Sequence, residues 1–318
     1  MRILVLGAGG TGGYFGGRLA QAGVDVTFLV RPTRAAQLAR EGLRLRSPLG
    51  DADLAVAHVT ADALPALAAA QPFDLVVLSC KAYDLDTAID AIAPAVGAGT
   101  SVMPILNGLQ HYAALDARFG ADRVLGGLCF ISAVKGPEGE VVHLPSPPSL
   151  TFGERDPARN GSARTQALAQ ACARAEGFEA VRSDDFLQAA WNKFSFLTAM
   201  AAATCLMRAS IGRIVASDEG AAFVAALHDE CLAVAAAQGQ AIPAQAAEQA
   251  RSLLTRAGSP ATASMLRDLE SGQDVEAAQI VGDMLARARQ HGIAAPRLQA
   301  AWVHLQCYRS RRESPATP

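Results

Sequence analysis

The sequence predicts an α/β domain built on a parallel sheet, followed by an all-α domain. In the first half, short apolar runs rich in β-branched residues alternate with helical patterns, which is typical of β-α-β units. After Ser183 the pattern becomes helical almost throughout, with long alanine-rich segments. We therefore expect an α/β domain at 1–183, a helical domain at 184–309 and a disordered tail at 310–318.

The elements are expected in this order. The first strand, Ile3–Leu6, leads through a glycine-rich turn into a helix at Tyr14–Ala22, and Val24–Val30 forms the second strand. Two further strands are expected at Asp74–Ser79 and Ser101–Leu106. The remaining strand-like runs, of which the last two would complete the sheet, are Val124–Val134, Glu140–Leu144, Ser149–Gly153 and Glu179–Arg182. The helical domain should end in a helix that runs from Asp274, as its N-cap, to Gly292.

Composition excludes several classes of protein. The chain has 318 residues and a net charge of −2, so it offers no electrostatic footprint for nucleic acid or an anionic membrane. The longest apolar stretch, 194–207, is shorter than the roughly 20 residues of a membrane span. Six scattered cysteines without a C-x-x-C pair predict neither a metal site nor a disulfide framework. We therefore expect a cytoplasmic protein without metal.

The turn after the first strand has the spacing G-x-G-x-x-G. In a β-α-β unit this spacing is specific for a Rossmann dinucleotide site, whereas glycine-rich turns elsewhere are common. The first glycine permits the tight turn, the second lets the pyrophosphate approach the backbone, and the third lets helix and strand pack closely. The predicted cofactor-binding residues of this turn are Gly7, Ala8, Gly9, Gly10, Thr11 and Gly12.

The second strand ends at an arginine rather than an acid. Sites specific for NAD usually place Asp or Glu here, to bind the ribose hydroxyls. This chain has Arg31 and then Arg34, with no acid between Val26 and Arg40. Guanidinium groups suit a 2′-phosphate, so NADP(H) is the expected cofactor, although arginines in a solvated loop are the alternative.

Polar residues follow two later strands and open the long apolar helix. Lys81 and Asn107 lie at the carboxyl edge of the sheet, where doubly wound sheets bind ligands. Lys193 opens the apolar helix, and a lysine in apolar surroundings can act as a general acid near neutral pH. Taken singly, each of these residues is better explained as a solvated lysine or a turn asparagine.

At these residues the chain resembles the ketopantoate reductase (2-dehydropantoate 2-reductase) family. The resemblance runs from Met1 to about Leu305, and the joint match of its motifs is far more specific than any one of them. The anchors are the N-terminal glycine turn, Arg31, Lys81-Ala82, Asn107-Gly108, Trp191-x-Lys193, Ser264-Met265-Leu266-x-Asp268, Glu276, and Arg287-Ala288-Arg289-x-His291-Gly292-Ile293-x-x-Pro296.

The resemblance implies a reductase in which NADPH delivers hydride to the ketone of a 2-keto acid. By resemblance, Lys193 donates the proton, Asn107 and Lys81 lie by the nicotinamide and the substrate, and Glu276 lies near the ribose and the reacting centre. Ala133 would contribute backbone to the cofactor. The substrate would bind in the cleft between the Rossmann domain and the helical domain, and the helical domain could also support a homodimer.

Ser264 has two compatible interpretations. It precedes a helical segment, so its hydroxyl could cap that helix. By resemblance, it would instead contact the carboxylate of the substrate. We give the two interpretations equal weight.

The chain departs from the family where pocket asparagines would hold the hydroxyl and carboxylate of the substrate. All four of these positions are apolar here, namely Leu197, Ala201, Ile211 and Ala261. Thr198 or Thr204 could substitute, but a shift of one residue on a helix points about 100° away. Three functions therefore stay open: reduction of 2-dehydropantoate in pantothenate biosynthesis, a D-2-hydroxy acid dehydrogenase with a more apolar substrate, and a non-catalytic NADP(H)-binding sensor. Retention of Lys193, Asn107 and Glu276 speaks against the sensor.

Overall fold

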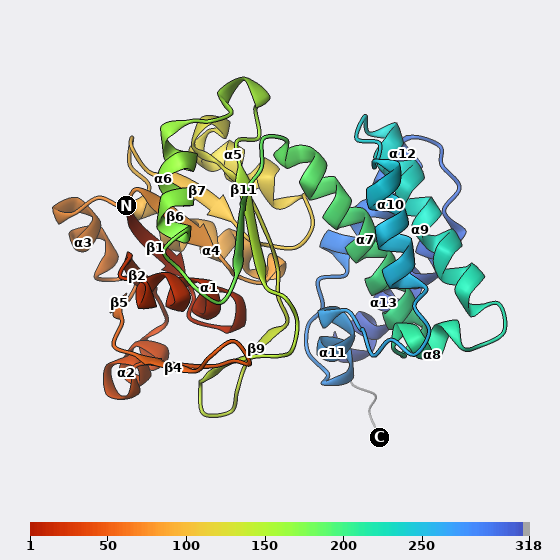
Figure 1. Ribbon diagram of the computed structural model, residues 1–318, viewed down its shortest axis with the longest axis horizontal. Coiled ribbons are helices and arrows are strands. Elements are labelled where there is room, and N and C mark those ends of the chain that lie inside the picture. The colour runs from red at the N-terminus through yellow and green to blue at the C-terminus, as the bar shows by residue number, and fades with distance from the viewer. Residues whose placement is uncertain (314–318) are drawn as a thin grey trace. The chain divides into compact units, whose positions relative to one another are not determined.

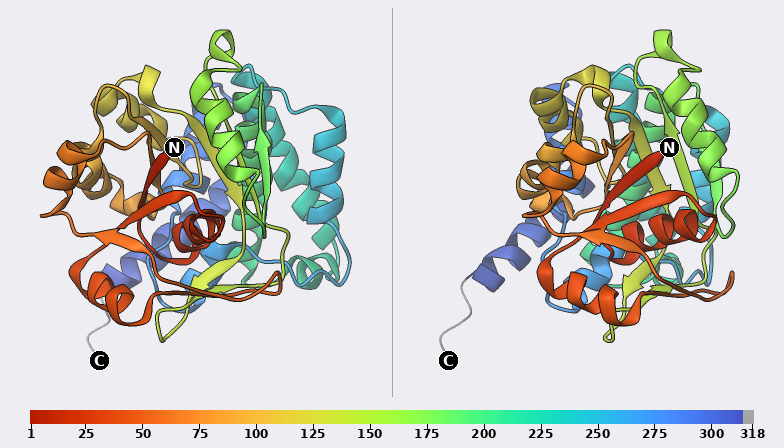
Figure 2. Two further views of the ribbon diagram at one scale, coloured as in Figure 1. Left: turned by 60° about the vertical axis from the view of Figure 1, so that its left-hand side comes forward. Right: turned by 90° about the vertical axis from the view of Figure 1, so that its left-hand side faces the viewer.

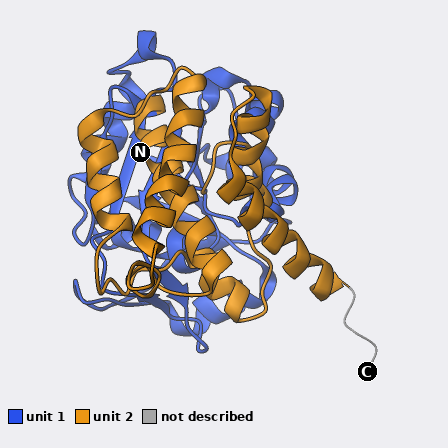
Figure 3. Cartoon of the chain, turned by 90° about the vertical axis from the view of Figure 1, so that its right-hand side faces the viewer, with its two compact units in different colours: residues 1–106, 111–186 blue, residues 107–110, 187–318 orange. Residues whose placement is uncertain are grey.

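The structure is a computed structural model that describes residues 1–313 and divides into two compact units (Figure 3). Unit 1 contains Met1–Leu106 and His111–Phe186, and unit 2 contains Asn107–Gln110 together with the chain from Leu187 onward. Unit 1 is α/β and unit 2 is helical, which confirms the predicted fold class. The chain passes into the helical unit at Leu187, close to the predicted boundary at 183. The short segment Asn107–Gln110, far before this point in the sequence, also belongs to unit 2.

Unit 1 is centred on a five-stranded parallel sheet in the order β5-β2-β1-β6-β7 (Figure 1). The innermost strand, β1, has Ile3 and Leu4 fully buried, because helices cover both faces of a parallel sheet and select continuous apolar runs. From β1 the chain first adds strands on one side of the sheet and then, with β6, on the other side. Doubly wound sheets bind ligands at this switch point, beyond the carboxyl ends of the strands. The strands are β1 (Arg2–Leu6), β2 (Asp25–Leu29), β5 (Ala57–Val59), β6 (Leu75–Leu78) and β7 (Ser101–Pro104).

The helices of unit 1 pack closely on this sheet where glycines leave room. A Cβ added to Gly16 of α1 would lie 2.8 Å from the ring of Phe28 in β2. The first helix, predicted at Tyr14–Ala22, begins earlier than Tyr14, at Gly10 inside the glycine motif. The helices are α1 (Gly10–Gln21), α2 (Pro32–Glu41), α3 (Leu64–Ala70), α4 (Leu85–Ile92), α5 (His111–Phe119) and α6 (Ala163–Cys172), with short 3-10 turns at Ala82–Asp84, Ala93–Ala95, Ala121–Arg123 and Pro157–Arg159.

Two smaller sheets complete unit 1. One has the order β4-β3-β10-β9 and the other β12-β11-β8. The prediction that Ser149–Gly153 and Glu179–Arg182 complete the central sheet was wrong, because these two strands pair with each other and the first of them pairs with β8. A single parallel bridge, Val102 to Val124, joins β7 to the chain before β8. The strands of the smaller sheets are β3 (Leu43–Arg46), β4 (Ala52–Leu54), β8 (Gly126–Phe130), β9 (Ala133–Lys135), β10 (Val141–His143), β11 (Ser149–Gly153) and β12 (Glu179–Arg182).

Unit 2 is a set of helices around an alanine-rich core. Small side chains such as Ala199, Ala202 and Ala203 are fully buried, so neighbouring helices approach closely. The end of α13 projects from the other helices of this unit (Figures 2 and 3). The elements are α7 (Phe186–Met207), α8 (Ile211–Val215), α9 (Gly220–Ala237), α10 (Ala244–Leu254), α11 (Ser264–Glu270), a π-helix at Ala278–Gly282, α12 (Asp283–Gln290) and α13 (Pro296–Glu313).

Two predictions for the second half are corrected by these helices. The helix expected from Asp274 begins instead at Ala278, with a π-helical turn, and its helical hydrogen bonding ends at Gln290. Residues 310–313, expected in a disordered tail, belong to α13, and 314–318 lie outside the described residues. Among residues 1–313, α9 alone is long and apolar enough to cross a membrane, with mean hydropathy 1.4. Its Val224, Leu227 and Val234 are fully buried in the unit 2 core.

Candidate functional site

The glycine turn adopts the conformation that the motif predicts. Gly7 has a φ of +91°, which favours glycine, and its N–H donates to the carbonyl of Leu29 at the end of β2. Gly9 is the N-cap of α1 and supplies no side chain to satisfy the first backbone N–H groups of the helix. These N–H groups and the helix dipole favour an anion at this end of α1.

Two other glycines of the motif are required by close packing. A Cβ on Gly10 would lie 2.6 Å from the carbonyl oxygen of Ala133. A Cβ on Gly12 would lie 2.7 Å from the carbonyl oxygen of Gly7 and would collide with the hydroxyl of Ser79. That hydroxyl donates to the carbonyl of Leu6, so it is fixed beneath the turn. The motif therefore holds α1 against β1, β6 and β9.

A cavity of about 660 Å³ lies over this turn in unit 1. Six of the predicted cofactor residues line it, namely Gly7, Ala8, Gly9, Gly10, Thr11 and Arg31. The sequence analysis missed other lining residues that come from neighbouring strand ends and loops, including Thr60, Ala61, Asp62, Cys80, Thr87 and Lys135. An open cavity over a glycine-rich turn, at the positive end of a helix, fits the phosphates of a dinucleotide.

The two arginines of this cavity are held differently. Arg31 is exposed, is the N-cap of α2 and is one of the residues that line the cavity. Arg34 is half-buried, and its guanidinium donates to the carbonyl of Ala8 at 3.0 Å and to the side chain of Gln37 at 2.7 Å. Burial lowers the pKa of Arg34 below its ordinary value. Arg34 is therefore bound to the glycine turn itself, and Arg31 is the better placed of the two to bind a phosphate.

Lys81 and Ala133 lie near this cavity but do not line it. Lys81 follows β6 and is the N-cap of the 3-10 turn at Ala82–Asp84, and its side chain is half-buried. Ala133 begins β9 and contacts the glycine turn through its carbonyl. Their predicted contacts with a cofactor remain predictions.

In unit 2, three predicted residues form one chain of polar contacts. The Lys193 ammonium donates to Oδ1 of Asn107 at 3.1 Å, and Nδ2 of Asn107 lies 3.4 Å from Oε2 of Glu276. Lys193 lies on α7 and Glu276 just before the π-helix, and they are only 8% and 6% exposed. The amide of Asn107 thus accepts from a cation on one side and donates to a carboxylate on the other.

Ser264 lies in a different element of unit 2. It is the first residue of α11, and the N-cap is Ala263, which makes no side-chain capping bond. The interpretation of Ser264 as the cap of this helix was therefore wrong. Its side chain is half-exposed, and a contact with a substrate carboxylate remains a prediction.

The four positions that depart from the family are apolar in their surroundings as well as in identity. Ala201 and Ile211 are fully buried in the core of unit 2, while Leu197 and Ala261 pack partly buried against that core. The backbone N–H of Ile211 donates to the carbonyl of Ala261 at 3.0 Å, so these two positions are neighbours.

Neither threonine considered as a substitute is accessible. Thr198 and Thr204 are both 0% exposed. The hydroxyl of Thr204 donates to the carbonyl of Met200 at 2.7 Å, as a helical threonine commonly does. The asparagine positions therefore have no polar replacement from these two residues.

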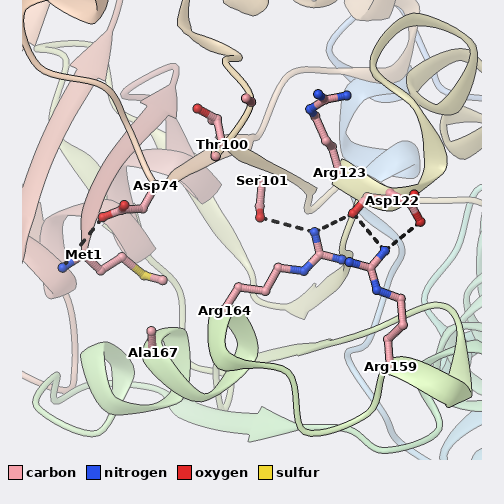
Figure 4. A pocket seen from close by; sticks show the side chains of 11 residues that line it. Met1, Asp74, Thr100, Ser101, Asp122, Arg123, Arg159, Arg164 and Ala167 are labelled. Atoms are coloured by element: carbon pink, nitrogen blue, oxygen red, sulfur yellow. Dashed lines mark hydrogen bonds and ion pairs between the residues drawn. The ribbon is translucent and has the colours of Figure 1, made fainter.

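A second cavity, of about 540 Å³, lies at the amino ends of β1, β6 and β7 in unit 1 (Figure 4). Its arginines are already paired. Arg164 donates to Glu154 and to the carbonyl of Asp122, and Arg159 donates to the carboxylate of Asp122 at 2.7 Å. Because carboxylate and carbonyl oxygens take up these guanidinium groups, we assign no ligand to this cavity.

Most of the chain matches one family in two parts. Residues 3–157 match the family described as ketopantoate reductase PanE/ApbA, and residues 185–308 match its C-terminal part. The chain is 34% identical over 314 residues to an uncharacterized oxidoreductase, YkpB, of Bacillus subtilis, covering 98% of this chain and 100% of that protein. It is 31% identical to a 2-dehydropantoate 2-reductase of Halobacterium salinarum, covering 93% of this chain and 95% of the relative.

Solved structures share the fold over nearly the whole chain. The 2-dehydropantoate 2-reductase of Geobacter metallireducens superimposes with a TM-score of 0.85 at 30% identity, covering 96% of this chain and 99% of that one. A D-mandelate dehydrogenase, solved with NADH and anilino(oxo)acetate, gives a TM-score of 0.85 at 19% identity, covering 98% and 100%. At that identity the second likeness concerns the fold alone.

Proposed function

Because the chain belongs to the ketopantoate reductase PanE/ApbA family, we propose that it catalyses the NADPH-dependent reduction of a 2-keto acid to a 2-hydroxy acid. The family is one of oxidoreductases that act on small molecules. The observation that carries the proposal for this chain is the contact of Lys193 with Asn107 and of Asn107 with Glu276. A protein that only binds a dinucleotide has no use for such a buried lysine–amide–carboxylate chain.

The proposed cofactor is held by unit 1. The turn Gly7–Gly12 would bind the pyrophosphate through backbone N–H groups, and Arg31 would bind the 2′-phosphate that distinguishes NADPH from NADH. Lys81 is proposed to lie by its nicotinamide, and the backbone of Ala133 is proposed to contact the cofactor. When bound, the cofactor supplies hydride to the keto carbon.

The proposed proton donor is Lys193. Reduction of a ketone places negative charge on its oxygen, and an ammonium group stabilises this charge and then neutralises it by transferring a proton. Burial removes most of the water around the lysine, so its interaction with the developing charge is stronger than in bulk solvent. The lysine then recovers a proton from solvent before the next turnover.

Asn107 and Glu276 orient this donor. Since Oδ1 of Asn107 accepts from the ammonium, it helps to fix the position of Nζ. The carboxylate of Glu276 accepts from Nδ2, which keeps the amide oxygen turned toward the lysine. In the proposed reaction Asn107 also contacts the substrate, Glu276 also contacts the cofactor ribose, and Ser264 contacts the substrate carboxylate.

The first candidate substrate is 2-dehydropantoate, the activity named for the relative from Halobacterium salinarum, which would place the enzyme in pantothenate biosynthesis. A second candidate is favoured by Leu197, Ala201, Ile211 and Ala261, because apolar side chains cannot hydrogen-bond the substrate hydroxyl. That candidate is a D-2-hydroxy acid dehydrogenase activity on a more apolar keto acid.

One pair of substrates separates these two candidates. 3,3-Dimethyl-2-oxobutanoate differs from 2-dehydropantoate only by lacking its hydroxyl group. We would measure kcat/KM for both from the oxidation of NADPH. A site that binds the hydroxyl should favour 2-dehydropantoate by a factor of roughly 10⁴, whereas an apolar site should prefer the deoxy analogue. A wider panel should include phenylpyruvate. Tight NADPH binding without turnover of any keto acid would leave the non-catalytic sensor.

We also propose that the enzyme works in the cytoplasm and forms a homodimer through the helical unit. None of the six cysteines, all within residues 1–313, forms a disulfide, which is usual for a protein of a reducing compartment. Sedimentation equilibrium of the purified chain tests the dimer.

A further inference from the structure

The segment Asn107–Gln110 has no regular secondary structure, yet it carries the residue that contacts both Lys193 and Glu276. It follows β7 in the sequence but belongs to unit 2. Because a short irregular segment is ordinarily mobile, something in unit 2 has to hold Asn107 in register with the lysine.

Besides the two bonds of the Asn107 side chain, three contacts hold this segment. Gly108 has a φ of +82°, and a Cβ there would lie 2.5 Å from the carbonyl oxygen of Gln279, so its backbone lies directly on the π-helix. Leu109 packs against the unit 2 core. The side chain of Gln110 donates from Nε2 to Oδ1 of Asp283 at 3.2 Å. Of these, only the last is a directional contact made by a side chain.

Asp283 is itself fixed in place. Its side chain is 7% exposed, and both carboxylate oxygens accept from Nε of Arg287 at 3.1 Å. Arg287 also donates to Oε1 of Gln238 at 3.0 Å. A paired, buried carboxylate is a strong and well-placed acceptor, so the bond from Gln110 is charge-assisted.

Arg287 links this contact to the helix of the proton donor. Its guanidinium lies over the ring of Trp191, 5.4 Å from the ring centroid. Trp191 is two residues before Lys193 on α7. The same arginine thus touches the helix that carries the lysine and the acid that holds the asparagine segment. The π-helix at Ala278–Gly282 connects Glu276 to Asp283, and such helices often occur at functional sites.

We propose that Gln110, Asp283 and Arg287 form a positioning network that sets Asn107 against Lys193. The inference rests on the proposed function of Lys193 as proton donor. None of the three residues need touch substrate or cofactor, because they act through Asn107. Loss of the network should therefore misplace the donor, lowering kcat and leaving cofactor binding unaltered.

The test variant is Gln110→Leu, which removes one hydrogen bond from an exposed side chain and leaves Asp283 paired with Arg287. The matched control is Gln245→Leu, at an exposed glutamine on α10. We expect kcat with the best keto acid to fall about tenfold in Gln110→Leu, with the Kd for NADPH and Tm unchanged and the control at the wild-type value. In an Asn107→Ala background, Gln110→Leu should lower kcat no further.

An unchanged kcat in Gln110→Leu, or an equal loss in the Asn107→Ala background, would overturn the network. A second measurement does not depend on turnover. The side-chain amide resonance of Asn107, identified by its loss in Asn107→Asp, should shift in Gln110→Leu and stay in place in Gln245→Leu. If the wild-type chain reduces no keto acid, the proposed function fails, and this resonance alone decides the network: a shift supports it and an unmoved signal refutes it.

Discussion

Replacing Arg31 by alanine should weaken NADPH binding about ten- to a hundredfold while NADH binding stays nearly constant. Arg31 is exposed at the N-cap of α2 and lines the cavity over the glycine turn. A charge-assisted hydrogen bond contributes about 1.5–3 kcal/mol, and each 1.4 kcal/mol changes an affinity tenfold. Because NADH lacks the 2′-phosphate, removing the guanidinium takes away no hydrogen bond from it.

Arg34→Ala is the matched comparison, because Arg34 comes from the same helix and the same cavity. Its guanidinium donates to the carbonyl of Ala8, so its removal loosens the glycine turn that both cofactors share. We expect Arg34→Ala to weaken NADPH and NADH binding by similar factors. The dissociation constants of both cofactors for the wild type and the two variants can be measured by isothermal titration calorimetry.

The ratio of the Kd for NADH to the Kd for NADPH in each variant shows which arginine binds the 2′-phosphate. If Arg31→Ala weakens NADH as much as NADPH, Arg31 does not bind the 2′-phosphate. If Arg34→Ala alone reduces the preference for NADPH, the phosphate is bound by the more buried arginine, and the roles assigned from their hydrogen bonds are reversed.

Three further predictions concern other parts of the chain. Lys193→Ala should lower kcat by roughly 10²–10⁴ with the Kd for NADPH unchanged, and an unaltered kcat would remove Lys193 as the proton donor. Gly12→Ala, which places a Cβ against Gly7 and Ser79, should destabilise the fold by about 1–3 kcal/mol and weaken NADPH binding; calorimetric melting with an unchanged Tm would contradict this. Burial lowers the pKa of His228 to about 4, so the unfolded chain takes up this proton first as the pH falls. The free energy of unfolding by urea should therefore be at its full value above pH 6.5 and fall by about 2–3 kcal/mol toward pH 4, and His228→Gln should show less of this loss unless other groups cause it.

The parts of the fold predicted correctly are those with local signals. β1, the glycine turn and β2 follow from an apolar run, a fixed glycine spacing and a second apolar run. β4 and β5 are only three residues long, too short for a period to appear, and were missed. The alternation Leu43-Arg44-Leu45-Arg46 in β3 was a usable signal that went unread. The sheet to which β11 belongs depends on pairing with β8, which no local pattern encodes.

In the candidate site, too, the features encoded by neighbouring residues were predictable and the contacts between distant residues were not. The glycine turn is encoded within a few neighbouring residues, so the sequence predicts its position and its close packing. The contact of Lys193 with Asn107 joins residues that are 86 positions apart, and that of Asn107 with Glu276 joins residues 169 apart. Family resemblance named these residues, but only the fold brings them together. The distinction between Arg31 and Arg34 was likewise invisible, because it depends on the carbonyl of Ala8.

Asn107–Gln110 belongs to the helical unit but precedes the rest of that unit in the sequence, and this order affects folding during synthesis on the ribosome. These four residues emerge well before α7, to which Asn107 later binds. At about 5–20 residues per second, the interval lasts on the order of ten seconds. During this interval the sheet of unit 1 can form from β1 to β7. Leu109 stays uncovered in the meantime, because the unit 2 core against which it packs has not yet been made. The complete chain of contacts from Lys193 through Asn107 to Glu276 therefore cannot form until Glu276 has been synthesised, long after Asn107 itself.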